Sequence, residues 1–144
     1  MKTAASVLLV EDNAADVDLT RETLSTSRLQ IELDVARNGV EALDWLHACL
    51  DEGRELPDLI LLDLNLPRKN GREVLAEMRS TPSYKHLPVV VLSSSEAERD
   101  IAQCYALGAN CYVAKPVGFD AFKEIVEAVE HFWFSIVRLP KASA

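Results

Sequence analysis

The sequence predicts an α/β fold, a five-stranded doubly wound parallel sheet with five helices. The first observation behind this prediction is the run 59–66, which is apolar except for Asp63 and Asn65 and is bounded by Pro57 and Pro67. Such a run is typical of a central strand that is covered on both faces. The second observation is that short apolar runs alternate along the chain with segments of helical periodicity. Because crossover connections are right-handed, this alternation gives a doubly wound sheet.

The first strand is predicted over residues 6–10, a short apolar run that ends in an acidic pair. Asn13 follows, and its side-chain oxygen can cap a helix that we expect to run to about residue 25. Asp16 lies in the first turn of this helix, where a carboxylate favours the helix dipole. Residues 31–36 alternate enough to form the second strand.

Asn38 and Gly39 form the turn into the second helix, which is predicted over about residues 40–50. A polar loop over residues 51–57 then leads into the central strand. The third helix is predicted over about residues 72–79 and is ended by Pro82.

The fourth strand is predicted over residues 88–92, and it leads into a cluster of three serines. A helix over residues 96–107 follows, with Gly108 as a left-handed cap. Residues 111–114 form the last strand, and the last helix is predicted over about residues 119–137. Its apolar residues fall on one stripe, which comprises Phe122, Ile125, Val126, Val129, Phe132, Trp133 and Ile136.

Length and composition indicate one globular domain over residues 1–144, with 49% apolar residues. No apolar run is long enough to cross a membrane, and the N-terminus lacks the features of a secretory signal. We therefore expect a cytoplasmic protein that does not bind membranes. The three cysteines, Cys49, Cys104 and Cys111, suggest neither a disulfide framework nor a zinc site.

The charge balance is acidic, with 15 basic and 23 acidic residues and a formal net charge of −8. This charge opposes sequence-independent attraction to phosphate backbones, and the sequence has no basic stripe. Direct nucleic-acid binding is therefore disfavoured.

Chemically active side chains follow four of the predicted strands. Glu11 and Asp12 follow the first, Asp63 ends the third, Ser93 follows the fourth and Lys115 follows the fifth. Because the carboxyl ends of parallel strands meet at one edge of the sheet, we expect these groups to lie together. Each one alone has an ordinary explanation as a cap, a turn residue or a solvated side chain. Their joint occurrence favours a functional site.

Neighbouring carboxylates repel one another unless a cation neutralises them, and hard oxygen ligands suit Mg²⁺. Lys115 adds a second positive charge, and Ser93 adds a hydroxyl group. These groups around Asp63 describe a site that stabilises a phosphoryl group on the carboxylate itself.

The runs that carry these residues resemble the receiver domain of two-component response regulators. They are residues 8–12, 61–71, 91–94 and 112–116. The resemblance spans about residues 5–130, which would be the core, and leaves an extended C-terminal helix and tail over about residues 131–144. It implies a flavodoxin-like receiver fold and a signalling phosphoacceptor that catalyses only its own phosphotransfer and autodephosphorylation.

The resemblance implies that Asp63 accepts a phosphoryl group from a histidine kinase. Asp12, Asp63 and the backbone carbonyl of Asn65 would bind Mg²⁺, and Glu11 would assist through water. Lys115 would pair with the phosphoryl oxygens.

The resemblance also implies a switch. Ser93, where the family often has Thr, would close over the phosphoryl group, and Tyr112 would change rotamer with it. Tyr112 could equally be an ordinary edge aromatic. The bond between Lys115 and Pro116 is expected to be cis, which is admissible for an X–Pro bond in a tight turn.

Three further segments are similar to small response regulators that are paired with bacterial phytochrome kinases. They are the loop 51–57, the stretch 64–75 and the ending 131–140. This similarity implies a light-regulated kinase as the phosphodonor and homodimers through the fourth and fifth strands and helices. Since the chain stops soon after the last helix, we expect a stand-alone regulator whose output is its own surface. It could act as a shuttle in a phosphorelay, as a switch that binds a partner, or as a dimer whose surface changes with phosphorylation.

A physical argument supports the dimer. Phe134 lies about 120° away from the stripe centred near Phe122 and Val129, so the last helix would expose an aromatic residue. Exposed aromatic residues often mark interfaces. The alternative is that the C-terminal turns fold over the domain and bury Phe134 locally.

Two other classes of function remain. One is a pseudo-receiver, a binding module that keeps the fold without phosphorylation, and the presence of all the site residues argues against it. The other is a hydrolase that passes through its own aspartyl phosphate. Such an enzyme commonly has a second Asp two residues after the nucleophile, where this chain has Asn65.

Overall fold

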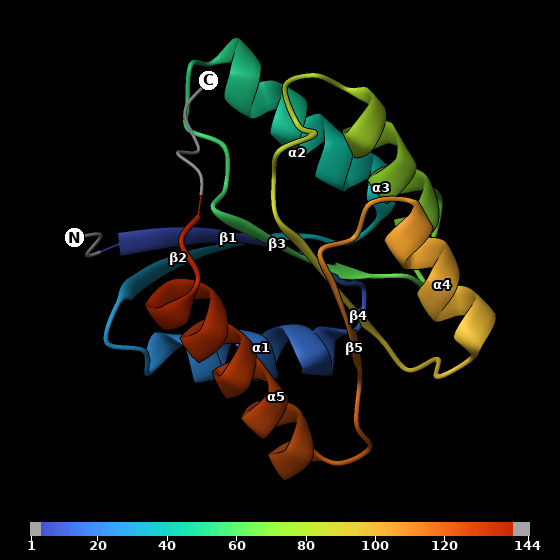
Figure 1. The fold of residues 1–144 in the computed structure, drawn as a ribbon. Coiled ribbons are helices and arrows are strands. Elements are labelled where there is room, and N and C mark those ends of the chain that lie inside the picture. Colours follow the sequence, from blue (N-terminus) through green and yellow to red (C-terminus); the bar gives the residue numbers. More distant parts are fainter. Residues whose placement is uncertain (1–3, 140–144) are drawn as a thin grey trace.

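A computed structural model describes residues 4–139, which form one twisted parallel sheet between two layers of helices (Figure 1). The strands lie in the order β2-β1-β3-β4-β5, and every neighbouring pair is parallel. Their bounds are β1 Ala4–Val10, β2 Gln30–Ala36, β3 Leu59–Asp63, β4 Val89–Ser93 and β5 Cys111–Ala114. The prediction of a five-stranded doubly wound sheet is confirmed.

Five α-helices alternate with the strands. They are α1 Ala14–Ser25, α2 Gly39–Asp51, α3 Gly71–Ser80, α4 Glu98–Ala106 and α5 Phe119–His131, and a π-helical turn, η1 Phe132–Ile136, continues α5. The helices α2, α3 and α4 cover one face of the sheet, and α1 and α5 cover the other (Figure 1). No helix within residues 4–139 is long and apolar enough to cross a membrane.

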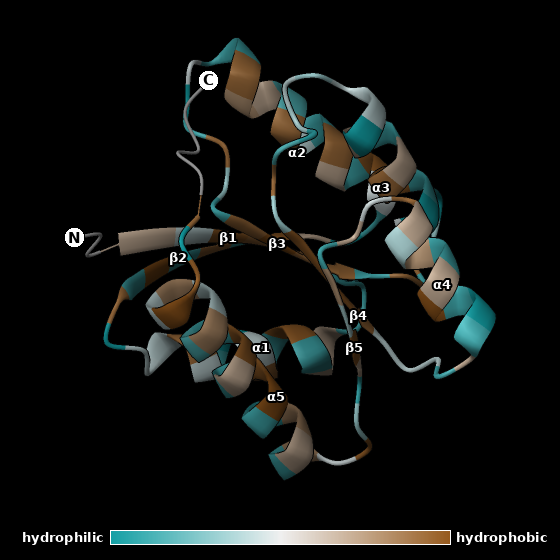
Figure 2. Cartoon of the chain, viewed as in Figure 1, coloured by the Kyte–Doolittle hydropathy of each residue, from teal (hydrophilic) through white to brown (hydrophobic). Residues whose placement is uncertain are grey.

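The central strands are buried on both faces, as their uninterrupted apolar runs predict. Successive side chains alternate between two cores. Leu8 and Val10 join the core under α2, α3 and α4, whereas Val7 and Leu9 join the core under α1 and α5. In Figure 2 the strands form a hydrophobic centre, and hydrophilic residues lie on the outer sides of the helices.

The helix starts follow the expected capping chemistry. The side chains of Asn13, Asn38 and Asn70 each accept a hydrogen bond from the backbone N–H three residues later. At α3, Glu73 also accepts a hydrogen bond from the backbone N–H of Asn70, which completes a capping box. Gly108, just after α4, has φ +105° and confirms the predicted left-handed cap.

The end of the last helix differs from the prediction. In η1 the Val137 N–H donates to the Phe132 carbonyl oxygen, an i→i+5 bond, so the turn is wider than an α-helical one. This turn buries Trp133 and packs Phe134 against the core under α1 and α5. Phe132 and Ile136 are 48% and 61% exposed. The predicted stripe was therefore wrong at these two residues, and the expected exposure of Phe134 was wrong as well.

Candidate functional site

The predicted site residues meet at the carboxyl edge of the sheet. Asp63 is the last residue of β3 and Ser93 is the last residue of β4, and both are buried. The register pairs Asp63 with Leu92 and Ser93 with Ala114, which sets Lys115 one residue beyond β5. Parallel pairing therefore collects groups that are distant in sequence.

The centre of the site is the Lys115 ammonium group. Its Nζ donates to Glu11 Oε1, to Asp16 Oδ2 at 3.0 Å and to Asp63 Oδ2 at 3.4 Å. Glu11 and Asp63 are 3% and 8% exposed, so solvent screens these charges only weakly. One ammonium group thus donates hydrogen bonds to three carboxylates from three different segments of the chain.

The sequence does not indicate a place for Asp16 in this site. It predicts only that the Asp16 carboxylate favours the helix dipole, and the structure does place this residue in the first turn of α1. That turn begins four residues after the end of β1, at the same edge as Glu11, so the Asp16 carboxylate also reaches Lys115. Proximity to a strand end was the signal that could have identified it.

Burial and the neighbouring charges shift the pKa values of two groups in the cluster. Burial raises the pKa of Glu11 to about 7, against a smaller opposing effect of the hydrogen bond from Lys115. Burial alone would lower the pKa of Lys115, but the hydrogen bond to Glu11 and the charges of Asp63 and Glu11 outweigh it and raise the pKa above its usual value. Lys115 is therefore a permanent positive charge.

Three carboxylates can hold a cation. Oxygen atoms of Glu11, Asp12 and Asp63 lie within 4.8 Å of one another, and Asp12 is exposed whereas the other two are buried. Oxygen donors at this spacing fit a hard divalent cation with several open coordination positions. The donor set therefore fits the predicted metal site, and it extends from the sheet edge to the surface.

The segment after β3 leaves no room for a side chain at Gly71. A Cβ atom on Gly71 would lie 2.4 Å from the Asp63 carbonyl oxygen and 2.8 Å from Leu64 Cα. The Gly71 N–H donates to the Leu64 carbonyl oxygen at 3.0 Å, and the Asn65 N–H donates to Asp63 Oδ1 at 3.3 Å. The start of α3 is thus packed directly on the backbone that carries Asp63.

The loop after β4 holds the predicted switch residues. Ser93 Oγ accepts a hydrogen bond from the Ser95 N–H at 3.2 Å. The Tyr112 hydroxyl donates to the Ser95 carbonyl oxygen at 2.7 Å, and its ring is half-buried beside the core under α2, α3 and α4. Ser93 and Tyr112 are therefore both connected to Ser95, a link that the sequence did not reveal.

The cis Lys115–Pro116 bond was predicted wrongly, because residues 4–139 contain no cis peptide bond. The trans form is the lower in energy for an X–Pro bond by about 0.5–1 kcal/mol. The trans form does not prevent the site from assembling, since Lys115 Nζ already reaches Glu11, Asp16 and Asp63.

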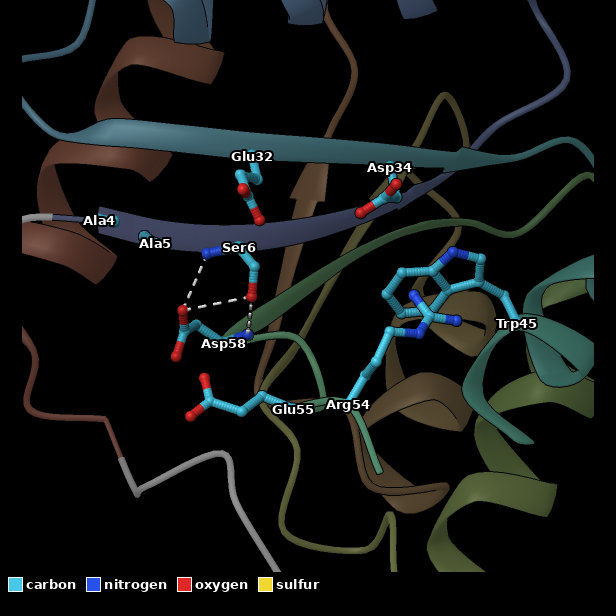
Figure 3. Close-up of a pocket in the computed structure, with 9 residues that line it drawn as sticks. All are labelled: Ala4, Ala5, Ser6, Glu32, Asp34, Trp45, Arg54, Glu55 and Asp58. Atoms are coloured by element: carbon cyan, nitrogen blue, oxygen red, sulfur yellow. Dashed lines mark hydrogen bonds between the residues drawn. The ribbon is translucent and has the colours of Figure 1, made fainter. Parts of the chain in front are cut away.

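A separate hollow of about 400 Å³ lies at the opposite edge of the sheet (Figure 3). Ser6 and Asp58 are part of its lining, and the Ser6 N–H donates a hydrogen bond to Asp58 Oδ2 at 2.8 Å. The Arg54 guanidinium lies 5.6 Å from the centre of the Trp45 ring. Ala4, Ala5, Glu32, Asp34 and Glu55 complete the lining. This hollow is at the amino ends of β1 and β3, away from the carboxylates around Lys115.

The family model for the response regulator receiver domain matches residues 7–128. The chain belongs to the response regulator receiver family. Among curated relatives, this receiver is 44% identical over 137 residues to Response regulator Rcp1 of Synechocystis sp., covering 94% of this chain and 93% of the relative. It is 35% identical over 134 residues to the probable methanogenesis regulatory protein FilR2 of Methanothrix harundinacea, covering 93% and 86% of the two chains.

Solved structures of response regulators share the receiver's fold. The phosphorylated cyanobacterial phytochrome response regulator RcpA has a TM-score of 0.90 and 45% identity, and the match covers 96% of this chain and 99% of RcpA. The Mn²⁺-bound form of Rcp1 has a TM-score of 0.88 and 44% identity, over 94% and 99% of the two chains. The predicted flavodoxin-like receiver fold is confirmed.

Proposed function

We propose that this receiver is a stand-alone response regulator that accepts a phosphoryl group from a histidine kinase on Asp63. The observation that carries the proposal is the position of Asp63, a buried carboxylate 3.4 Å from the Lys115 ammonium and within the three-carboxylate oxygen cluster. The match to Rcp1, which covers 94% of this chain and 93% of that relative, supports one receiver domain over residues 1–144.

The transfer would proceed by attack of an Asp63 carboxylate oxygen on the phosphorus of a phosphohistidine. The new O–P bond forms as the P–N bond breaks, and the imidazole leaves with the electron pair. Lys115 already faces Asp63, so a small movement of its ammonium would bring it onto the phosphoryl oxygens. Ser93 is buried at the end of the neighbouring strand, and its hydroxyl would then donate a hydrogen bond to a phosphoryl oxygen.

Glu11, Asp12 and Asp63 would hold the Mg²⁺ ion, together with the backbone carbonyl of Asn65, and Glu11 would act through water. Bound Mg²⁺ would supply the positive charge that lets a phosphoryl group approach several carboxylates. The exposed Asp12 marks the open side of the cluster, from which ion and donor would enter.

The deciding experiment is phosphorylation of the purified protein by a small acyl phosphate, with and without Mg²⁺, measured by intact mass. We expect a Mg²⁺-dependent gain of one phosphoryl group that is absent in Asp63→Asn. Asp44→Asn, which changes an exposed carboxylate on α2, is the matched control and should be phosphorylated normally. No gain in the wild type would favour the phosphorylation-independent pseudo-receiver, and rapid turnover of a small phosphate ester would favour the hydrolase.

We propose a phytochrome histidine kinase as the donor. Two similar structures support this, because RcpA is described as a phytochrome response regulator and AtBRR, at 38% identity and a TM-score of 0.70, as a bacteriophytochrome response regulator. The test is phosphotransfer from an autophosphorylated phytochrome kinase and from an unrelated histidine kinase. Equal rates from the two donors would contradict this pairing but not the phosphoacceptor role of Asp63.

We also propose a homodimer formed through the last strands and helices. Exposed apolar side chains of these elements support it, namely Tyr105 on α4 and Phe132 and Ile136 in the turn that continues α5. Phosphorylation would then act by changing the surface that the two copies share.

A further inference from the structure

Asp16 differs from the other carboxylates that contact the Lys115 ammonium. Lys115 Nζ donates to Glu11, to Asp16 Oδ2 at 3.0 Å and to Asp63 Oδ2 at 3.4 Å. The oxygen cluster that can hold a cation comprises Glu11, Asp12 and Asp63. Among the residues that the structure describes, Asp16 is therefore the carboxylate that contacts Lys115 without belonging to the cation cluster.

We propose that Asp16 is a positioning residue that draws the Lys115 ammonium away from Glu11 and Asp63 and so leaves these two carboxylates to a divalent cation. This inference rests on the proposed function, because it concerns the Mg²⁺ site around the phosphoacceptor. Asp16 touches neither the cation nor the reacting atoms. It acts through Lys115, so its effects are on metal affinity and on the position of the ammonium while the metal is bound.

The first step of the argument is that Lys115 competes with a metal ion. Glu11 and Asp63 accept hydrogen bonds from the Lys115 ammonium, and the same two carboxylates belong to the cation cluster. An ammonium bound to a ligand carboxylate neutralises part of its charge and repels a second cation nearby. The more tightly Glu11 and Asp63 hold the ammonium, the weaker metal binding becomes.

The second step is that Lys115 needs an anionic partner in every state of the site. Its side chain is 12% exposed, and an ammonium taken out of water without a partner carries a large desolvation cost. When a cation occupies the cluster, Glu11 and Asp63 share their negative charge with it. Asp16 then remains as the partner of the ammonium and holds it beside Asp63, where a phosphoryl group would meet it.

The third step is that Asp16 is held firmly in place. Its backbone N–H donates to Asn13 Oδ1 at 3.0 Å, and its carbonyl oxygen accepts a hydrogen bond from the Thr20 hydroxyl at 2.7 Å. Both contacts fix Asp16 in the first turn of α1, and a short side chain on a fixed backbone has few rotamers. The carboxylate is also only partly exposed, so solvent screens its attraction to Lys115 less than that of a surface ion pair.

The test is Mg²⁺ binding to the full chain, measured by calorimetry without a phosphodonor. Asp16→Asn keeps the shape of the side chain and removes its charge. We expect this variant to bind Mg²⁺ about tenfold more weakly, as when other residues that act on metal ligands from outside the coordination shell are changed. Asp18→Asn, which changes an exposed carboxylate on the same helix outside the cluster, is the matched control and should bind normally. Unchanged affinity in Asp16→Asn would overturn the proposal.

A double-mutant comparison separates the positioning of Lys115 from a plain effect of charge. In a Lys115→Met background the ammonium is absent, so Asp16→Asn should weaken Mg²⁺ binding there by only about twofold, as expected for the loss of one nearby negative charge. Equal effects of Asp16→Asn in the two backgrounds would overturn a role through Lys115.

A second measurement does not depend on the folding of Lys115→Met. The proton-nitrogen NMR spectrum of the lysine ammonium groups reports whether Lys115 keeps an anionic partner, because a hydrogen-bonded ammonium exchanges its protons slowly with water. On addition of Mg²⁺, the Lys115 signal should persist in the wild type and disappear in Asp16→Asn. Persistence in both proteins, or loss in both, would overturn Asp16 as the partner. Failure of the wild type to bind Mg²⁺, or unchanged binding in Asp12→Asn, would instead overturn the proposed metal site.

Discussion

The side chains around Lys115 show how one positive charge organises this receiver. Three carboxylates converge on its ammonium group, and the cluster extends from the buried Glu11 to the exposed Asp12. Removing a single partner from such a cluster leaves the other charges uncompensated in a poorly solvated place. The most informative substitutions are therefore those at its exposed rim.

Asp12→Asn should weaken divalent-metal binding without unfolding the protein, because this carboxylate is an exposed member of the oxygen cluster. Mg²⁺ at ten times its dissociation constant should stabilise the wild type by about 1.4 kcal/mol, and the variant should show much less stabilisation at the same concentration. Thermal unfolding with and without Mg²⁺ measures this difference. Asp18→Asn, an exposed carboxylate on α1 outside the cluster, should respond like the wild type.

Asp100→Asn should change the acid sensitivity of the protein. In the folded state the pKa of Asp100 lies below its ordinary value of 3.8, mainly because of the hydrogen bond from Ser95. Its ionised form therefore stabilises the fold at pH values above the ordinary value, and this contribution is lost as the pH falls through the lower, folded-state pKa. Urea unfolding should show the variant less stable than the wild type at pH 7, with the difference shrinking below about pH 4. A difference that does not vary with pH would contradict this assignment.

Among the site residues, those that stand directly at strand ends could be predicted from the sequence. Asp63 and Lys115 each end or follow an apolar run, and parallel pairing leaves one place for such residues to meet. Asp16 and the hydrogen bond from Ser95 to Asp100 could not be derived in this way, since both depend on how helices are placed against the sheet. A strand-end pattern carries no information about that placement.

The elements themselves were predictable wherever one periodicity held. The strand at residues 111–114 has the predicted bounds, and the first helix begins after its predicted asparagine cap. The prediction was wrong in the final turn, where a helical period was assumed through residue 137 and the backbone instead widens into η1. The choice between an α-helical and a π-helical turn depends on how the turn packs against the sheet. An apolar stripe in the sequence carries no information about that packing.

Gly71→Ala should disturb the element that supports Asp63. Its Cβ atom would overlap backbone atoms of Asp63 and Leu64, and overpacking of this kind costs about 1–3 kcal/mol. We expect a lower free energy of unfolding and a strongly reduced rate of phosphorylation by an acyl phosphate. Gly53→Ala is the matched control: at φ +69° it costs about 1–2 kcal/mol of backbone strain, but its Cβ atom meets nothing. Equal phosphorylation rates in the two variants would contradict the supporting role of Gly71.

Trp133→Ala should be far more destabilising than Phe132→Ala. Trp133 is 9% exposed and packs in the core under α1 and α5, so its truncation should cost about 3–5 kcal/mol. Phe132 is 48% exposed and meets Trp133 edge to face, a contact worth about 0.5–1.5 kcal/mol. Chemical denaturation of both variants gives the comparison. Similar losses would indicate that the α-helical stripe, with both side chains buried, describes this turn better than η1 does.

At the scale of the whole molecule, the sheet divides the receiver into a chemical edge and a structural edge. Every group proposed for phosphoryl transfer lies at the carboxyl ends of the strands, whereas the hollow around Asp58 lies at the amino ends. The side chains between these edges form two separate cores, one on each face. The phosphorylation site is therefore close to the surface of α4 and β5 and far from the loop before β3.

The proposed dimer can be tested on this larger surface. Ile136 is 61% exposed at the end of the chain that the structure describes, and Ile136→Asp would place a charge in an apolar contact between copies. We expect the wild type to sediment as a dimer at micromolar concentration and the variant as a monomer. Leu50→Asp, which changes an exposed apolar residue on α2 outside the proposed dimer surface, should not change the sedimentation. A wild type that stays monomeric with and without beryllofluoride, a mimic of a phosphoryl group on a carboxylate, would exclude the dimer.

The loop between α2 and β3 lies at the edge of the sheet opposite the phosphorylation site, which makes it a suitable place for an insertion. Residues 51–55 are exposed, and Gly53 has open space around its Cα. The loop joins the amino end of β3, so the length of that strand, about 13 Å from Leu59 to Asp63, separates it from the phosphoacceptor. A fluorescent domain inserted at Gly53, or a circular permutation that opens the chain there, would leave the site and the surface of α4 intact. The receiver could in this way carry a fluorescent label without a change in its phosphorylation.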